Sequence, residues 1–302
     1  MKRTGCLLFT ALPVVAAAAV FFLTPADDGG PAPGASATQE SRKDAKVRAE
    51  QGPGQRSPDA EVLADAPPGL AAPAKKELAQ QIVASAENST LDWRTSYGSI
   101  EDIGDGCGYT AGVIGFCTGT HDLLGLVERY TREHPDNGLA RYLPALRAVD
   151  GTGSHEGLDP GFPAAWKAEA KLPAFRQAQE RERDEVYFEP AVRLAKLDGL
   201  GTLGQFVYYD AMVLHGPGID ADGFYVLRER AMRQAKTPAQ GGEEKTYLSA
   251  FLDVRRAAMR QRRTTQDTSR VDTAQRRWLD SGNLTLDTPL SWEMYGESYR
   301  VP

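Results

Sequence analysis

Two carboxyl groups in this sequence have a setting that suits acid–base chemistry. Glu87 stands at the end of a predicted helix, and Asp105 lies between two glycines in the run DIGDGCGYT at residues 102–110. A pair of carboxyl groups, one protonated and one ionised, is the chemical minimum for hydrolysing a glycosidic bond. The two residues are therefore candidates for a general acid and a general base.

The position of Glu87 favours a protonated carboxyl group. The negative end of the helix macrodipole raises the pKa of a carboxyl at a helix C-terminus, and partial burial beside the apolar stripe of the helix does the same. A general acid needs such a raised pKa to keep its proton near neutral pH. The alternative is a solvated last-turn residue, since most helical glutamates are surface charges.

The glycines around Asp105 allow more than one interpretation. They remove side chains from the approach to the carboxylate, which suits a base that lies close to a substrate. Asp105-Gly106 is also a common two-residue hairpin turn with no chemistry of its own. A phosphate loop is disfavoured because no helix follows directly and the acid would repel phosphate. A calcium loop is disfavoured because neither 102–109 nor 220–223 has the oxygen spacing of an EF-hand.

Other common catalytic arrangements are missing from the sequence. The four histidines show no HExxH pattern and no CxxC occurs, so a zinc site is not predicted. No GxSxG motif marks a serine nucleophile. We expect no metal and no cofactor.

The N-terminal part differs in composition from the rest. Residues 1–26 have a basic start and a long apolar run, as in a secretory signal cleaved after Ala26, although the run is long enough for an uncleaved anchor. Residues 27–71 are rich in Pro, Gly and Ala, which predicts a disordered linker or pro-segment. Residues 72–302 hold every Trp and Tyr and are long enough for one large domain or two lobes. We therefore expect a secreted protein whose mature form is not held in a membrane.

Net charge limits the class of binding partner, and the number of cysteines indicates the redox state of the compartment. The net charge of −6 argues against a nucleic-acid partner and is compatible with a cationic one. Cys6 would leave with the signal, so the mature chain would carry only Cys107 and Cys117. An even pair in an oxidising compartment predicts a disulfide between them.

The spacing of apolar residues predicts a mainly α protein with a small antiparallel sheet. A hairpin is predicted over 97–116, with Asp105-Gly106 at its turn. One helix is expected directly after Thr120, which would be its N-cap. Further helices are expected over 75–87, 139–149, 175–196, 203–214, 224–236, 247–261 and 271–280.

Six stretches together resemble the chitosanases of glycoside hydrolase family 46. They are SAENSTLDW (85–93), IEDIGDGCGYTAGVIGFCTGTHD (100–122), RERDEVYFEPAV (181–192), QFVYYDAMVLHGPG (205–218) and the pair TPAQGGEEKTYLSAFLDVRRAAM (237–259) and DTSRVDT (267–273). The resemblance covers nearly all of residues 72–302, in order. It implies a lysozyme-like fold with a substrate cleft between two lobes, and internal, inverting cleavage of chitosan, a polymer of β-1,4-linked glucosamine. We expect the enzyme to be a monomer.

The resemblance also implies roles for single residues. Glu87 would be the general acid and Asp105 the general base that activates water, with Thr110 helping to hold that water. A supporting charge network, or alternatively a purely structural ion-pair cluster, would consist of Asp210, Arg255 and Arg270. Substrate contacts would come from Asn88, Gly115, Asp122, His215 and Gly216. Carboxylates such as Asp122 would attract the ammonium groups of chitosan. Glu101, Asp102 and Asp267 could add to this negative electrostatic potential.

One position departs from the family pattern. Cys107 stands where familiar members carry Arg, which could contact the catalytic Asp or the sugar. A disulfide from Cys107 to Cys117 would brace the hairpin instead. Two rival functions remain at this point: a lysozyme- or chitinase-like hydrolase of acetylated glycans, and a non-catalytic polysaccharide-binding protein. The presence of both Glu87 and Asp105 speaks against the second.

Overall fold

The computed structural model describes residues 57–262 and 267–302, which belong to one compact unit. The predicted signal peptide and most of the predicted linker lie outside the described residues. No helix within the described ranges is long and apolar enough to cross a membrane. The helices are α2 (Pro58–Asp65), α3 (Pro73–Glu87), α4 (Asp122–Glu133), α5 (Leu143–Val149), α6 (Phe162–Glu169), α7 (Pro173–Glu182), α8 (Glu189–Leu197), α9 (Thr202–His215), α10 (Phe224–Met232), α11 (Glu244–Arg262) and α12 (Arg276–Asp280).

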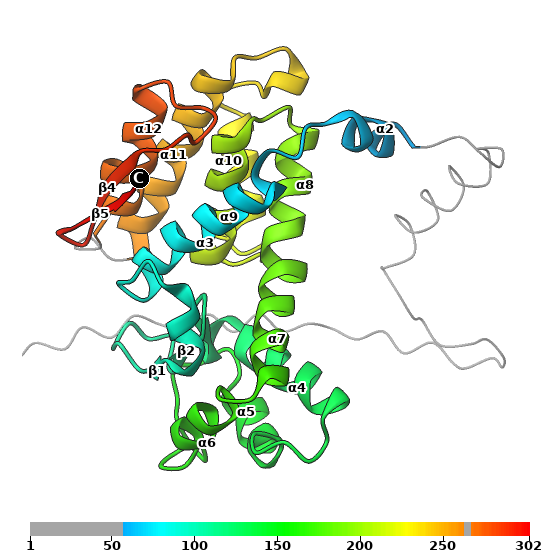
Figure 1. The fold of residues 1–302 in the computed structure, drawn as a ribbon, viewed down its shortest axis with the longest axis vertical. Coiled ribbons are helices and arrows are strands. Elements are labelled where there is room, and N and C mark those ends of the chain that lie inside the picture. Colours follow the sequence, from blue (N-terminus) through cyan, green and yellow to red (C-terminus); the bar gives the residue numbers. More distant parts are fainter. Residues whose placement is uncertain (1–56, 263–266) are drawn as a thin grey trace, which may run out of the picture. The chain divides into compact units, whose positions relative to one another are not determined.

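One long helical rod links two groups of elements (Figure 1). The rod consists of α7, the π-helical segment η5 (Arg183–Phe188) and α8. One group holds α9 to α12 with the hairpin β4 (Leu290–Met294) and β5 (Glu297–Val301), and the other holds α4 to α6 with a small sheet. The helix expected over 175–196 is thus present, but its middle is π-helical, and π-helical turns often occur near functional sites.

The small sheet confirms the predicted hairpin but corrects its turn. Strands β1 (Ile100–Glu101), β2 (Thr110–Ala111) and β3 (Phe116–Cys117) pair antiparallel in that order, with Glu101 opposite Thr110. The chain between β1 and β2 is therefore an eight-residue loop, 102–109, rather than a two-residue turn at Asp105-Gly106. Asp102 and Asp105 each accept a hydrogen bond from the backbone N–H two residues on, which bends the chain twice.

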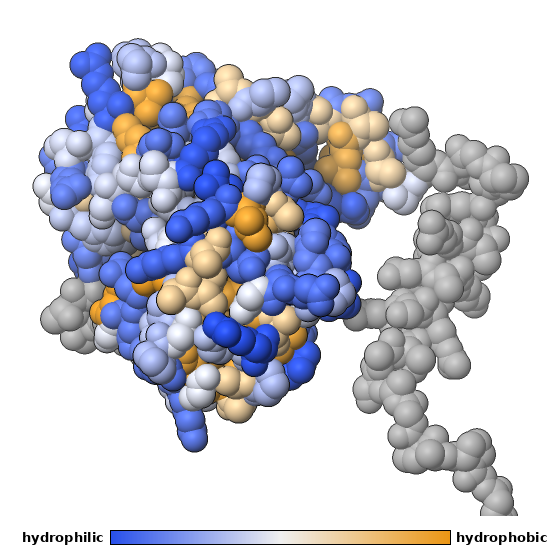
Figure 2. All heavy atoms as spheres, turned by 60° about the horizontal axis from the view of Figure 1, so that its bottom comes forward, coloured by the Kyte–Doolittle hydropathy of each residue, from blue (hydrophilic) through white to orange (hydrophobic). Residues whose placement is uncertain are grey.

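A single apolar core supports both groups of elements. Its largest buried side chains include Trp166, Trp292, Tyr208 and Tyr209. Helix α3 turns Leu78, Ile82 and Val83 towards this core, at the spacing that predicted the helix. The face in Figure 2 is mostly hydrophilic with small separate apolar patches, as expected when the large apolar side chains are buried.

One local prediction is wrong, and two elements were not predicted. Helix α4 begins at Asp122 after His121, whose φ of 70° is left-handed, so Thr120 is not its cap and instead donates a hydrogen bond to Asp122. Helix α6 was not expected, although Pro163 is well placed in its first turn and Phe162 and Trp166 are buried. The hairpin β4–β5 was not expected either.

Part of the predicted linker is folded. Ser57 caps α2, and its Oγ accepts a hydrogen bond of 3.3 Å from the backbone N–H of Ala60. Leu70 is fully buried and its N–H donates to Gln205 Oε1 at 2.8 Å. The prediction of disorder is therefore wrong for residues 57–71. The average composition of this segment predicts disorder because it does not show that one apolar side chain, Leu70, is buried in the core.

Candidate active site

A cleft of about 730 Å³ brings the two candidate acids together. Its walls come from the end of α3, the loop 102–109, strands β2 and β3, the start of α4, η5, the end of α9 and the tip of the β4–β5 hairpin. The lining residues are Glu87, Ile103, Asp105, Gly106, Cys107, Thr110, Ile114, Gly115, Cys117, Gly119, Thr120, Asp122, Gly151, Tyr187, Val213, Leu214, Gly216, Asp267 and Tyr295.

Glu87 is the last residue of α3, and its side chain is 18 % exposed. Burial raises the pKa of its carboxyl group, whereas Arg270 opposes the rise by donating a hydrogen bond of 2.6 Å from Nη1 to Oε1. The Asp105 carboxylate adds to the rise. The pKa lies above its ordinary value, which is the direction that a general acid requires.

Gly115 keeps space open beside the Glu87 carboxyl group. Its φ is 73°, and a Cβ added there would lie 3.1 Å from both Glu87 Oε2 and Thr110 Cγ2. Any larger residue would therefore strain the backbone and crowd this oxygen. Because Oε1 is held by Arg270, the glycine leaves Oε2 as the oxygen beside Thr110 in the cleft.

Asp105 is exposed on the loop 102–109. Gly104, Gly106 and Gly108 all have a left-handed φ, between 71° and 86°, which only glycine adopts without strain. A Cβ at Gly104 or Gly106 would meet no atom within 4 Å. These two glycines are therefore required by the backbone turn, and they also leave the approach to Asp105 unobstructed.

Cys107 and Cys117 form the predicted disulfide. The bond ties the loop directly after Asp105 to strand β3, with the two Cα atoms 6.0 Å apart. The carbonyl oxygen of Cys107 also accepts hydrogen bonds of 2.9 Å from Thr118 Oγ1 and from the N–H of Gly119. The half of the loop that follows Asp105 is thus fixed to the cleft wall.

Replacing both Cys107 and Cys117 by alanine is expected to lower the free energy of unfolding by about 2 to 3 kcal/mol, because the unfolded chain loses a short covalent loop. Urea denaturation followed by circular dichroism measures the change. A reducing agent should shift the wild-type midpoint to that of the double variant and leave the variant unchanged. Equal midpoints of both proteins without reductant would contradict the prediction.

Asp122 forms part of the cleft wall at the start of α4. Its Oδ1 accepts hydrogen bonds of 2.7 to 2.9 Å from Thr120 Oγ1 and from the N–H groups of Cys117 and Leu123, and its Oδ2 accepts one of 2.7 Å from Tyr187 OH. Burial raises the pKa of Asp122, and these hydrogen bonds oppose the rise. Most of its capacity as an acceptor is therefore used to shape the wall.

The predicted charge network exists behind Glu87. Asp210, only 1 % exposed, accepts 2.8 Å and 3.0 Å hydrogen bonds from Arg270 Nε and Arg255 Nη2. Gln275, which the sequence did not indicate, donates to Asp210 and accepts from Arg255. Burial alone would raise the pKa of Asp210, but the two arginines lower it below its ordinary value. Asp210 thus stays ionised and orients Arg270 towards Glu87.

Tyr295 is a cleft residue that the sequence alone did not indicate. It occupies the two-residue turn between β4 and β5, where its φ of 52° and that of 84° at Gly296 match a type I′ turn. Its N–H donates to Ser269 Oγ at 3.0 Å, next to Arg270. Gly296 at the second turn position, between two alternating runs, was the one local signal for this turn.

Some predicted residues do not reach the cleft. Asn88 follows Glu87 but is not among the lining residues, and His215 is buried one residue before Gly216, which does line it. Asp210, Arg255 and Arg270 lie behind the wall. Glu101 and Asp102 are exposed outside the lining, whereas Asp267 is part of it.

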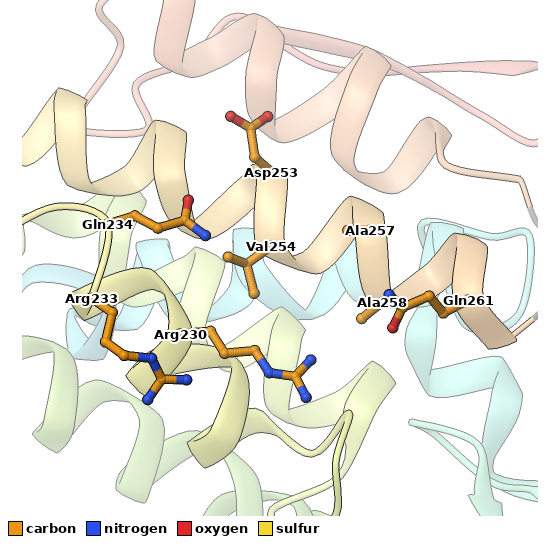
Figure 3. A pocket seen from close by; sticks show the side chains of 8 residues that line it. All are labelled: Arg230, Arg233, Gln234, Asp253, Val254, Ala257, Ala258 and Gln261. Carbon is orange, nitrogen blue, oxygen red and sulfur yellow. The ribbon is translucent and has the colours of Figure 1, made fainter.

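A second cavity of about 420 Å³ lies between α10 and α11 and shares no lining residue with the cleft. Figure 3 shows Arg230 and Arg233 side by side, with the Asp253 carboxylate pointing away from them. Because Asp253 is its one carboxylate, this cavity has no acid pair. Among residues 57–262 and 267–302, no group of three or more His, Cys, Asp or Glu side chains could hold a metal ion.

Curated relatives share much of the sequence. A chitosanase of a Streptomyces species is 58 % identical over 229 residues, which are 76 % of this chain and 82 % of the relative. A chitosanase of a Nocardioides species is 55 % identical over 229 residues, which are 76 % of this chain and 82 % of that relative.

Solved structures share the fold. A chitosanase crystallised with substrate is 51 % identical with a TM-score of 0.75, over 77 % of this chain and 98 % of the other. A Gynuella sunshinyii chitosanase in complex with chitotetraose is 34 % identical with a TM-score of 0.69. The match covers 75 % of this chain and 97 % of the other. These similarities confirm the lysozyme-like, mainly helical fold class. The family model of glycosyl hydrolase family 46 matches residues 81–290, and this chain belongs to that family.

Proposed function

We propose that this protein is a chitosanase that cleaves β-1,4 linkages between glucosamine units inside chitosan, with inversion at the anomeric carbon. The observation that carries the proposal is that Glu87 and Asp105 line one cleft in a chain of family 46. The raised pKa of Glu87 suits the general acid that protonates the leaving oxygen. Asp105, exposed on its loop, would take a proton from the attacking water.

Thr110 and the charge network support these two roles. Thr110 lines the cleft beside Gly115, where its hydroxyl could help to hold the attacking water. Arg270 holds one oxygen of Glu87, so the other oxygen keeps one orientation towards the cleft. Because an inverting mechanism needs a water between base and sugar, it requires the two carboxyl groups to stand about 6.5 to 9.5 Å apart.

The cleft suits a cationic polysaccharide. Relatives that are 55 to 58 % identical are chitosanases, and a structural neighbour is bound to chitotetraose. The carboxylates of Asp105, Asp122 and Asp267 on the cleft walls would attract the ammonium group that each glucosamine unit carries. Neutral acetylated sugars lack this attraction, which favours chitosan over chitin as substrate.

Secretion and domain boundaries follow the same proposal. Because a long polysaccharide meets the enzyme outside the cell, we propose that residues 1–26 are a secretion signal and that the mature protein acts as an extracellular monomer. The catalytic domain would comprise residues 72–302, and the end of the preceding segment, 27–71, packs onto it at Leu70.

The products of chitosan hydrolysis test this proposal. Fully deacetylated chitosan incubated with the protein is expected to give shorter oligomers whose new reducing ends are first seen by NMR as the α anomer. Initial β anomers would contradict inversion. Faster release of reducing ends from highly acetylated polymer would instead favour a chitinase- or lysozyme-like activity. Binding of chitosan without any hydrolysis would favour a polysaccharide-binding protein.

Tyr295 is expected to contribute to substrate binding. It is 48 % exposed although it lines the cleft, and a phenol ring can pack on a sugar. Replacing Tyr295 by alanine should raise KM for a chitosan oligomer about fivefold, which corresponds to about 1 kcal/mol of contact energy, with a smaller change in kcat. Tyr225, an exposed tyrosine on α10 outside the cleft, gives the matched control. Equal KM values in the two alanine variants would contradict a substrate contact.

A further inference from the structure

One histidine contacts both ends of the loop that carries Asp105. The loop 102–109 begins with Asp102 and ends with Tyr109. The His155 ring stacks on the Tyr109 ring, with centroids 4.0 Å apart and planes inclined by 6°. On the other side, His155 Nε2 lies 3.3 Å from Asp102 Oδ2. The imidazole therefore lies against both ends of the loop, by ring stacking at Tyr109 and by close approach at Asp102, where its buried Nε2 makes no hydrogen bond.

His155 is itself held in place. Its Nδ1 lies 3.6 Å from Asp159 Oδ2, and the Tyr109 hydroxyl donates a hydrogen bond to the other oxygen of the same carboxylate. The backbone carbonyl of His155 accepts a hydrogen bond of 2.9 Å from the N–H of Leu158. The side chain is 23 % exposed. Tyr109, His155 and Asp159 thus contact one another, and Asp102 joins them through His155; we name these four residues the loop clasp.

The loop clasp restrains the backbone on the near side of Asp105. Asp102 Oδ1 accepts a hydrogen bond of 2.7 Å from the N–H of Gly104, while its Oδ2 faces His155. The segment that carries His155 also touches the loop beyond Asp105, since a Cβ on Gly153 would lie 2.7 Å from the carbonyl oxygen of Gly106. The disulfide holds Cys107 after Asp105, and the clasp holds Asp102 before it and Tyr109 at the end of the loop.

Such restraint matters because the loop contains three glycines in left-handed conformations. A glycine backbone has more accessible conformations than any other, so the carboxylate of Asp105 needs support from outside the loop. A general base acts only when it lies within hydrogen-bond reach of the proton it removes. A displacement of about 1 Å can reduce the rate by a factor of about 10².

We propose that His155 is a positioning residue for Asp105, acting through Asp102 and Tyr109. The proposal rests on the proposed function, in which Asp105 is the general base. His155 does not line the cleft, so its contribution is to the orientation of the base and not to substrate contact. It should therefore affect kcat and leave KM nearly unchanged.

The principal test replaces His155 by phenylalanine, which keeps a ring against Tyr109 and removes both nitrogens. The expected result is a loss in kcat on chitosan of about tenfold with KM changed by less than about twofold. His134→Phe is the matched control, because this exposed histidine also contacts a tyrosine ring, that of Tyr130, but lies outside the cleft. The control should keep the wild-type kcat.

A second comparison separates positioning from general loss of structure. In an Asp105→Asn background the base is already removed, so adding His155→Phe should not lower the residual kcat further. An equal tenfold loss in that background would overturn the proposal, as would an unchanged kcat or a change in KM alone. Asp102→Asn, which keeps an oxygen for Gly104 but weakens the pairing with His155, should lower kcat in the same direction and to a smaller extent.

The same assay keeps the two proposals apart. If the wild-type protein does not hydrolyse chitosan, the proposed function fails. If the wild-type protein is active and His155→Phe has the same kcat, the positioning role fails and the proposed function stands.

Discussion

Replacing Glu87 by glutamine is expected to lower kcat on chitosan by a factor of about 10³, because the leaving oxygen would depart without a proton donor. KM should change by less than about threefold, since glutamine has the same shape and still accepts a hydrogen bond from Arg270. Steady-state release of reducing ends measures both constants. Glu77→Gln, the same change earlier in α3 on a residue that pairs with Arg94, is the control and should keep wild-type activity.

The pH profile gives a second measurement of the same role. The active form of a general acid is protonated, so kcat/KM falls as pH rises through its pKa. Burial raises the pKa of Glu87, so this alkaline fall should lie above the ordinary glutamate range of about 4 to 4.5. The residual activity of Glu87→Gln should lack that fall. An unchanged alkaline limb in the variant would assign the acid role to another group.

Replacing Asp210 by asparagine is expected to destabilise the protein by about 3 to 5 kcal/mol at neutral pH. The change leaves the guanidinium groups of Arg255 and Arg270, 0 % and 2 % exposed, without their shared carboxylate. Urea denaturation at pH 7 measures the loss. Asp253→Asn removes an exposed partner of Arg276 and should cost less than about 1 kcal/mol. A similar small cost at Asp210 would show that the buried network contributes little to stability.

The pH dependence of this difference follows from the pKa of Asp210. That pKa is lowered in the folded state, so the ionised carboxylate contributes stability above its unfolded pKa, and this contribution is lost as pH falls through the folded pKa. The difference in unfolding free energy between wild type and Asp210→Asn should therefore be largest near neutral pH and decrease below about pH 4. A difference that stays constant down to pH 3 would contradict this assignment.

Local signals in the sequence predicted much of the fold and the two acids. The apolar spacing over 75–87 placed Glu87 at the end of a helix, and the structure ends α3 at that residue. The pair Cys107 and Cys117 predicted a disulfide that the structure contains. These features depend on residues near one another in the chain, and helical period, short loops and cysteine number are visible in a single sequence.

Other features depend on contacts that sequence spacing does not show. The prediction of a two-residue turn at Asp105-Gly106 was wrong, because two Asx turns at Asp102 and Asp105 extend the loop to residue 109. The folding of residues 57–71 depends on Leu70, which is buried against a helix more than 100 residues later. Tyr295 enters the cleft from the last hairpin of the chain.

The sequence by itself determined which groups can donate and accept protons, because residue type sets the chemistry and the end of a helix sets the local field around Glu87. Only the tertiary structure decided which of these groups lie together in one cleft. Arg270 reaches Glu87 across 183 positions, and His155 meets Asp102 and Tyr109 from a separate loop. Burial, and with it the raised pKa of Glu87 and the lowered pKa of Asp210, arises when distant segments exclude water around a charge, so it follows from the packed fold.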